Sequence, residues 1–420
     1  MEEMKSIEGF PIGDDEDILE LSNPPYYTAY PNPYIKKFIE KYGKPYDPET
    51  DDYKKEPFVG DVSEGKNDPV YMMHPYHTKV PPKAIMQFVE HYTNKGDLVF
   101  DGFCGSGMAG VASSRLNRNC IICDLSPEAT FISYNNNANF NIDQIKYHLK
   151  IISKNIEEFY KNYETKEKGI KYNFKAAVWS EVFECPTCKE RIVYWDQFVN
   201  ESDKDELVSE IKCCNCGISL TKKDLNRRII NGKTEKVPVR IYYKKGKQID
   251  YKKVDSDDLS KLKQIESGVS PFWYPDYEIN FSKQDGSWGE LWRKGYHTGI
   301  LNYSDFYSIR NIKGLAIIYN EINKIEDSSK YFFMYCFSAI LRGSSFLEIY
   351  RVENRGPAKG SFNHMYMPSL TYEVNVFDEF LNKCEKNIRF YEKSDEKIGK
   401  ALISTQSSND LNNFLTNSID

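Results

Sequence analysis

The 420-residue chain lacks a long hydrophobic run, because its densest apolar stretch, Tyr331 to Leu341, is far shorter than the ~20 residues of a membrane-spanning helix. The amino terminus, MEEMKSIEGF, lacks the apolar core of a secretory signal. An excess of positive charge is also missing, since the formal net charge is -6, so bulk charge does not attract nucleic acid. We find no internal repeat. The lack of a membrane span and of a signal predicts a cytoplasmic protein, and the length of 420 residues suffices for two or three domains.

Composition and pattern divide the chain into five expected segments. Residues 1–66 are irregular and rich in Pro, Tyr and Asp. Strand and helix signals alternate through residues 67–175, which we interpret as a nucleotide-binding α/β domain. Residues 176–255 look β-rich and contain two cysteine pairs and a basic stretch, whereas residues 256–362 carry a helical pattern. Residues 363–420 hold an extended stretch and a charged helix.

The strongest local signal is a glycine loop between two expected strands. Residues 98–100 form a short apolar run, and Gly102, Gly105 and Gly107 follow at once. Glycines at this place allow a tight turn and a close approach of a ligand to the backbone. A second apolar strand ends at Asp124, where a carboxylate can accept hydrogen bonds from ribose hydroxyls. The pattern is GxxGxG, so it does not match the GxGxxG of NAD-binding domains.

The acid-first loop, DGFCGSG, resembles motif I of S-adenosylmethionine (SAM)-dependent methyltransferases. The upstream HPYHTKVPP resembles motif X of DNA amino-methyltransferases. In that family this segment lines the pocket for the methionine end of SAM. The resemblance assigns that role to His74, Pro75, Thr78, Lys79 and Pro81. The expected cofactor-binding residues are Thr78, Lys79, Asp101, Gly102, Phe103, Cys104, Gly105, Ser106, Gly107, Asp124 and Leu125.

A candidate catalytic tetrapeptide, Asn23-Pro24-Pro25-Tyr26, resembles the [DNS]PP[YFW] motif of the same family. There the polar side chain and a backbone carbonyl accept hydrogen bonds from the target amine, and the aromatic ring stacks on a flipped base. A proline-rich turn without function is the alternative. About fifty residues separate this motif from motif X, which is too few for the strands and helices that a permuted enzyme would need there.

The carboxyl-terminal ISTQSSNDLNNFLTNSID resembles the lead-in to motif IV, which a strand and DPPY or DPPF follow in the family. The order of motif X, motif I, insert and motif IV is the family's alpha-like arrangement. We therefore predict that this chain is the amino-terminal part of a longer or split enzyme. Its partner would be a second chain that carries DPPF or DPPY.

Two CxxC pairs predict a metal site. Cys185 and Cys188 precede Cys213 and Cys216, and 24 residues lie between the pairs. Two such knuckles place four thiolates around one structural zinc ion and leave no open position for catalysis. Disulfides are the weaker alternative in a reducing compartment.

A basic stretch follows the second cysteine pair. Thr221 to Lys247 contains ten Lys or Arg against two acids. Together with Tyr242 and Tyr243 it suits contacts to DNA phosphates, with base edges read nearby. The alternative is a structural ribbon with a solvated hairpin.

The predicted fold is α/β, a Rossmann-like SAM-dependent methyltransferase with a partial sheet, a zinc-ribbon insert and a helical segment. The resemblance implies transfer of a methyl group from SAM to adenine-N6 or cytosine-N4 of DNA, within a restriction-modification system. A SAM- and DNA-binding subunit without chemistry of its own is the second hypothesis. Methylation of an RNA or protein amine or amide is the third.

Overall fold

The computed structural model describes residue 16 and residues 31–44, 46–62, 67–201, 205–277, 299–357, 367–394 and 397–415. The candidate motif Asn23 to Tyr26 lies outside these residues. The chain forms two compact units whose segments interleave along the sequence. Unit 1 comprises 1–146, 331–336 and 384–420, and unit 2 comprises 147–330 and 337–383. The five sequence-based segments stay predictions.

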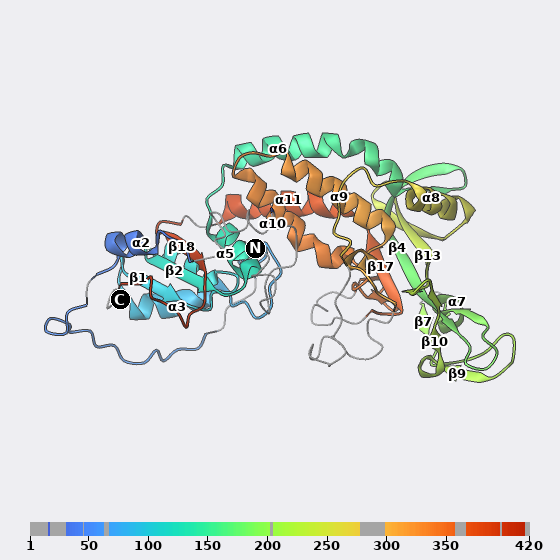
Figure 1. Cartoon of the computed structure of the whole chain (residues 1–420), viewed down its shortest axis with the longest axis horizontal. Coiled ribbons are helices and arrows are strands. Elements are labelled where there is room, and N and C mark those ends of the chain that lie inside the picture. The colour runs from blue at the N-terminus through green and yellow to red at the C-terminus, as the bar shows by residue number, and fades with distance from the viewer. Residues whose placement is uncertain are drawn as a thin grey trace. The chain divides into compact units, whose positions relative to one another are not determined.

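Unit 1 is built on a three-stranded parallel sheet in the order β1-β2-β18 (Figure 1). The strands are β1 (Leu98–Asp101), β2 (Asn119–Asp124) and β18 (Ala401–Thr405). β1 and β2 are the apolar runs that flank the glycine loop, and both were expected. β18 pairs with the other side of β2, with Ala401 opposite Cys120. All three carboxyl ends therefore lie at one edge of the sheet.

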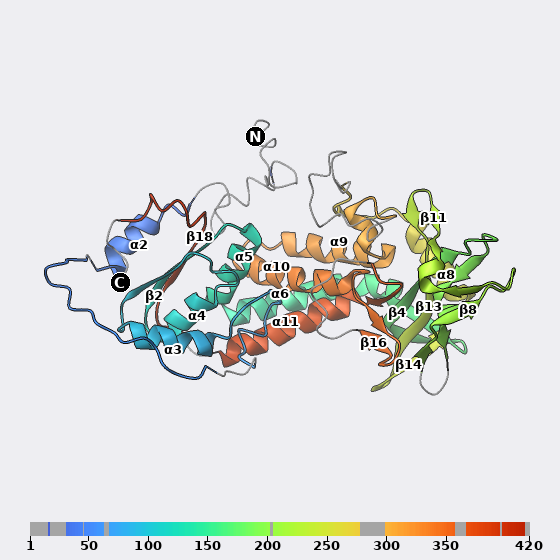
Figure 2. The same cartoon turned by 90° about the horizontal axis from the view of Figure 1, so that it is seen from below.

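Helices cover both faces of this sheet, because the side chains of β2 alternate between them. Ile121 and Cys123 pack with Ile35 and Ile39 of α2 (Ile35–Tyr42). Gly110 of α4 lies against Ile122 on the opposite face. Figure 2 shows α2 on one side of the strands and α3 and α4 on the other. The bounds of these two helices are Pro82–Tyr92 for α3 and Met108–Arg115 for α4.

The helix starts in unit 1 follow local sequence rules. α3 begins with Pro82, whose fixed φ suits a first helical position. α5 (Pro127–Asn137) begins with Pro127 after Ser126, whose hydroxyl accepts a hydrogen bond from the backbone N–H of Ala129. The SPEA sequence that follows Asp124 therefore ends the second strand and starts a helix at the same edge of the sheet.

Unit 2 is organised around one long strand, β4 (Ile170–Glu184), in which residues 176–183 are all buried. Figure 1 shows β13 and β17 beside it. Five strands pair with β4, all antiparallel: β3 (Glu164–Glu167), β5 (Arg191–Val193), β10 (Asn226–Arg227), β13 (Lys236–Lys245) and β17 (Leu370–Val374). β14 (Gln248–Lys253) extends the sheet beyond β13.

Four two-stranded pairs complete the described strands of unit 2. β8 (Glu210–Lys212) pairs with β9 (Ser219–Thr221), and β6 (Val199–Asn200) pairs with β7 (Glu206–Leu207). A short helix, α7 (Tyr194–Phe198), packs on them. β11 (Ile229–Ile230) pairs with β12 (Lys233–Thr234), and β15 (Tyr350–Arg351) with β16 (Gly356–Pro357).

The remaining α-helices are α6 (Ile142–Asn155), α8 (Ser256–Ser267), α9 (Ile309–Asn323), α10 (Ser329–Leu341) and α11 (Val376–Lys393). Ser308 caps the start of α9, as its hydroxyl accepts a hydrogen bond from the Asn311 N–H. Among the described residues, no helix has the length and apolar character needed to cross a membrane. The mixed α/β class that the sequence predicts is confirmed.

Candidate functional site

The glycine loop joins the carboxyl ends of β1 and β2 through hydrogen bonds. The Gly105 N–H donates to Asp124 Oδ2 over 2.9 Å, and the Phe103 N–H donates to Asp101 Oδ1 over 3.0 Å. The Cys104 N–H donates to the carbonyl of Cys123 over 2.9 Å. The loop is therefore held directly over the two strand ends, where parallel α/β sheets bind their ligands.

Two glycines of this loop have backbone conformations that other residues rarely adopt. Gly105 has a φ of +49° and Gly107 a φ of +72°. A Cβ atom on Gly107 would stand 2.1 Å from the hydroxyl of Ser133, and one on Gly105 would stand 2.9 Å from Cε1 of Tyr76. Both positions need glycine for conformation as well as for space.

Acidic groups dominate the electrostatics of the loop. Burial, with the nearby charge of Asp124, raises the pKa of Asp101 above its ordinary value. Burial also raises the pKa of Tyr76, and the charges of Asp124 and Glu128 act in the same direction. Burial is the main cause of each shift, and the negative charge of Asp124 adds to it. The site therefore favours a ligand with positive charge over an anionic pyrophosphate.

Two large apolar side chains are exposed beside these acids. Phe103 is 82% exposed and Leu125 is 74% exposed, although both belong to ordered turns at the strand ends. Cys104 and Ser106, by contrast, are buried and contribute packing. Exposed apolar groups next to hydrogen-bonding acids are typical of a site that binds a ligand with a flat apolar part.

The segment before α3 is fixed by internal contacts. The ammonium of Lys79 donates hydrogen bonds to the backbone carbonyls of Tyr71 and His74, the latter over 2.7 Å. Thr78 is exposed and has a φ of +58°. The side chain of Lys79 therefore stabilises its own loop. The expected role of Lys79 in binding SAM stays a prediction.

A buried ion pair ties this same segment to α4. Arg115 donates to both carboxylate oxygens of Asp68, at 2.6 and 3.3 Å, and both side chains are 2% exposed. Asp68 also accepts hydrogen bonds from the backbone N–H groups of Val70 and Tyr71. The ion pair therefore positions the loop from which Tyr76 extends toward Gly105.

Sequence reasoning missed two neighbours of the glycine loop. Tyr76 lies inside the HPYHTK motif, but nothing in its spacing indicates a contact with Gly105. A Cβ atom on Gly102 would stand 3.0 Å from Cβ of Ser408, which follows β18. The Gln406 N–H donates to the carbonyl of Asp124 over 3.0 Å. The return of β18 to the sheet brings this segment to the site.

The four expected cysteines form one cluster in unit 2. The Sγ atoms of Cys185, Cys188, Cys213 and Cys216 all lie within 4.8 Å of one another. Cys185 and Cys216 are 3.7 Å apart at sulfur, and Cys188 and Cys213 are 3.6 Å apart. These separations are far longer than a disulfide bond of ~2 Å. The cluster can hold a metal ion, and Cys214 lies exposed outside it.

The two halves of the cluster have the same backbone geometry. The Lys189 N–H donates to the carbonyl of Cys185 over 3.0 Å, and the Gly217 N–H donates to the carbonyl of Cys213 over 2.9 Å. Lys189 and Gly217 both have positive φ, at 60° and 71°. Backbone N–H groups of Cys216 and Asn215 lower the pKa of the Cys213 thiol to about 6, whereas burial and hydrogen bonds with the neighbouring thiols raise the pKa of Cys216. The backbone of the second turn therefore favours a thiolate at Cys213.

The basic stretch is largely neutralised within unit 2. Six of its ten cations form ion pairs: Arg227 with Glu181, Arg228 with Glu184 and Glu235, Lys233 with Asp305, Arg240 with Asp205, Lys244 with Asp378, and Lys245 with Asp250. Tyr242 and Tyr243 are only 6% and 3% exposed. The expectation that these two tyrosines face DNA is wrong, because they pack in the core around β4.

Comparison with known proteins identifies the class to which the amino-terminal part is related. Residues 4–135 match the N6/N4 methyltransferase family, described as DNA methylase. The matched range covers β1, the glycine loop, β2 and most of α5. It also includes Asn23 to Tyr26. This part of the chain is therefore related to the DNA methyltransferases that modify exocyclic amines, which are enzymes.

Two characterised methyltransferases are similar over shorter ranges. The type II methyltransferase M.MjaII of Methanocaldococcus jannaschii is 31% identical over 93 residues, which cover 22% of this chain and 18% of that protein. The type II methyltransferase M1.MboII of Moraxella bovis is 36% identical over 69 residues, which cover 16% of this chain and 25% of that protein. The chain thus matches a quarter or less of either relative. No solved structure matches the chain.

Proposed function

We propose that this chain is a SAM-dependent DNA methyltransferase, or part of one, that methylates the exocyclic amine of adenine or cytosine. The observation that carries the proposal is the acidic glycine loop at the carboxyl ends of two parallel strands, within the residues that match the DNA methylase family. The three parallel strands with helices on both faces support a Rossmann-like fold for unit 1.

The residues at the loop fit SAM by charge and by shape. Asp124 offers carboxylate oxygens to ribose hydroxyls, and exposed Leu125 and Phe103 offer apolar surface to the adenine ring. The carboxylates of Asp101 and Asp124 create the negative potential that a sulfonium and an ammonium group prefer. When bound, SAM supplies an electrophilic methyl group. Pyrophosphate of NAD would meet the same acids with unfavourable charge.

The second part of the proposal concerns the amine grip, by which we mean the residues that bind and orient the target amine. Asn23 to Tyr26 has the composition of a tetrapeptide that orients an amine nitrogen toward a methyl donor. A second chain with DPPF or DPPY is the alternative source of this grip. β1 lies at one end of the described sheet, next to the glycine loop, and a catalytic strand that paired there would end beside the cofactor.

The cysteine cluster is proposed to hold one structural zinc ion. Four thiolates at ~2.3 Å from a tetrahedral zinc ion stand ~3.8 Å from one another, which is close to the sulfur separations of 3.6 and 3.7 Å in this chain. Four sulfur ligands saturate the ion, so its role is to fix β8, β9 and the end of β4. We place target recognition in this region as part of the same proposal.

Calorimetric titration with SAM tests the cofactor site. Asp124→Ala should weaken binding at least tenfold, since the ribose hydroxyls lose their acceptor. Asp52→Ala is a matched control, because Asp52 is an exposed acid remote in sequence from the loop. NADH should not compete. Equal SAM affinity in both variants would contradict the placement of the site.

Transfer of a tritiated methyl group into unmodified genomic DNA tests the chemistry. We expect SAM binding with little transfer by the isolated chain, and transfer after addition of a polypeptide that carries DPPF or DPPY. Transfer by the chain alone that disappears with Asn23→Ala would instead assign the amine grip to residues 23–26. Persistent inactivity with DNA would favour a non-catalytic subunit, and parallel reactions with RNA and protein test the third hypothesis.

A further inference from the structure

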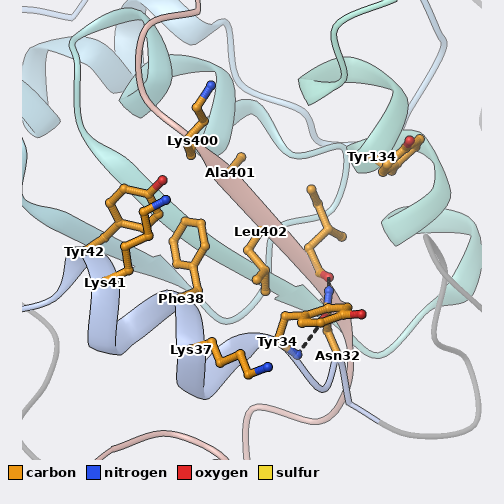
Figure 3. Close-up of a pocket in the computed structure, with 11 residues that line it drawn as sticks. Asn32, Tyr34, Lys37, Phe38, Lys41, Tyr42, Tyr134, Lys400, Ala401 and Leu402 are labelled. Carbon is orange, nitrogen blue, oxygen red and sulfur yellow. Dashed lines mark hydrogen bonds between the residues drawn. The ribbon is translucent and has the colours of Figure 1, made fainter.

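A groove of about 640 Å³ runs between α2 and the outer edge of β18 in unit 1 (Figure 3). It lies along the strand edge and not at the glycine loop, so the proposed cofactor does not fill it. The residues that line it are Asn32, Tyr34, Lys37, Phe38, Lys41, Tyr42, Tyr134, Lys400, Ala401, Leu402 and Ile403.

The lining carries three cations and no carboxylate. Lys37 and Lys41 stand one helical turn apart on α2, a rise of ~6 Å along the axis, and Lys400 immediately precedes β18. All three side chains are exposed, and none forms an ion pair with another described residue. The groove therefore has a positive potential on a chain whose formal net charge is -6.

Aromatic rings alternate with these lysines. Tyr34 is 54% exposed, and the rings of Phe38 and Tyr42 lie 4.7 Å apart between centroids. Figure 3 shows Phe38 and Tyr42 on α2 facing Leu402 and Ala401 of β18. An anion that fills such a groove must also present flat apolar groups, which is the chemistry of nucleotides with unpaired bases.

The groove is formed before any ligand arrives. The Asn32 N–H donates to the hydroxyl of Ser404 over 2.9 Å, and the Asn32 side-chain amide donates to the carbonyl of Ile403 over 2.9 Å. Ile35 and Ile39 bury the opposite side of α2 against the sheet. Helix and strand edge are therefore anchored to each other, and the walls need no rearrangement to bind.

We propose that this groove binds single-stranded DNA, with phosphates on Lys37, Lys41 and Lys400 and bases against Tyr34 and its neighbouring rings. The choice of DNA over other nucleotide chains rests on the proposed methyltransferase function. An acidic peptide that adds a strand to the β18 edge is the competing occupant. The aromatic rings between the lysines favour the nucleotide chain, because a peptide strand would need backbone pairing and not stacking.

Fluorescence anisotropy of the full chain with labelled oligothymidylate tests this assignment. Lys37→Ala/Lys41→Ala should lower the slope of log affinity against log salt by ~0.7 for each phosphate contact removed. Tyr34→Ala should weaken binding by about fivefold to a hundredfold, the range for loss of one stacked base. Lys36→Ala is the matched control, since Lys36 is an exposed lysine of the same helix that does not line the groove.

Unlabelled single-stranded DNA should compete, whereas duplex DNA, oligouridylate and an acidic peptide should compete less well. Stronger competition by any of these three would overturn the assignment, as would equal affinity of the Lys37/Lys41 and Lys36 variants. SAM titration of each variant checks that unit 1 is folded. Asp124→Ala should weaken SAM binding at least tenfold and keep oligothymidylate binding, so failure of the cofactor site and failure of the groove are distinguishable.

Discussion

Replacement of Gly105 by alanine should separate backbone strain from damage to the cofactor site. At a φ of +49°, a side chain costs ~1–2 kcal/mol because L-residues disfavour the left-handed region. The new Cβ atom would also stand 2.9 Å from Cε1 of Tyr76, so this ring must move away from the loop. We therefore expect a modest loss of stability together with a loss of SAM affinity.

Gly96 provides the matched control in the same unit. Its φ is +91°, yet nothing lies within 4 Å of an added Cβ atom, so Gly96→Ala should show strain without collision. Thermal melting should show a decrease for both variants, ~2–4 °C for each kcal/mol in a unit of this size. Calorimetric titration should show SAM affinity reduced about tenfold or more, ~1.4 kcal/mol, for Gly105→Ala alone.

A double-mutant cycle identifies the role of Tyr76. If the ring transmits the damage, Tyr76→Ala should recover part of the affinity that Gly105→Ala loses, because the collision partner is gone. Unchanged SAM affinity in Gly105→Ala, or an equal loss in Gly96→Ala, would refute the assignment of the loop contact to cofactor binding.

Elemental analysis should find about one zinc ion per chain, and Cys185→Ser should lower this value whereas Cys214→Ser, outside the cluster, should not; a folded protein without metal would exclude the site. Arg115→Leu should lower the free energy of unfolding by ~3–5 kcal/mol in chemical denaturation, because it leaves the Asp68 carboxylate buried and unpaired. Burial raises the pKa of Asp68, but Arg115 and the backbone N–H groups of Val70 and Tyr71 together hold it below its ordinary value. The stabilisation is therefore complete above pH ~4 and should fall as the pH drops below that value, and Asp68→Asn should remove this part of the acid dependence.

The parts of the site that were predictable are those encoded by short spacings. The loop from Asp101 to Gly107 and the carboxylate of Asp124 belong to a strand, a tight turn and a second strand. Each of these elements is determined by residues that are close together in the sequence. The two cysteine pairs also bring four sulfur atoms together as expected. Each CxxC turn fixes its own two thiolates, and two such turns commonly share one metal ion.

The parts that were missed depend on contacts between distant segments. Tyr76 meets Gly105 because the Asp68–Arg115 pair anchors the preceding loop, and this pair spans 47 residues. Tyr242 and Tyr243 were expected at a surface because lysines surround them in the sequence. They are buried because β13 lies inside the sheet between β4 and β14. The charged neighbours of these tyrosines in the sequence therefore did not indicate that the tyrosines are exposed.

The interleaving of the two units has a consequence for how the chain folds during synthesis. Cys120 of β2 pairs with Ala401 of β18, 281 residues later. At ~5–20 residues per second, the ribosome needs ~15–55 s to make that stretch, and β2 waits for its second partner throughout. An unpaired apolar strand such as NCIICD is a template for wrong pairing. Early folding of unit 2, most of whose strands lie between residues 164 and 253, would shorten the chain that β18 must close and thereby limit misassembly.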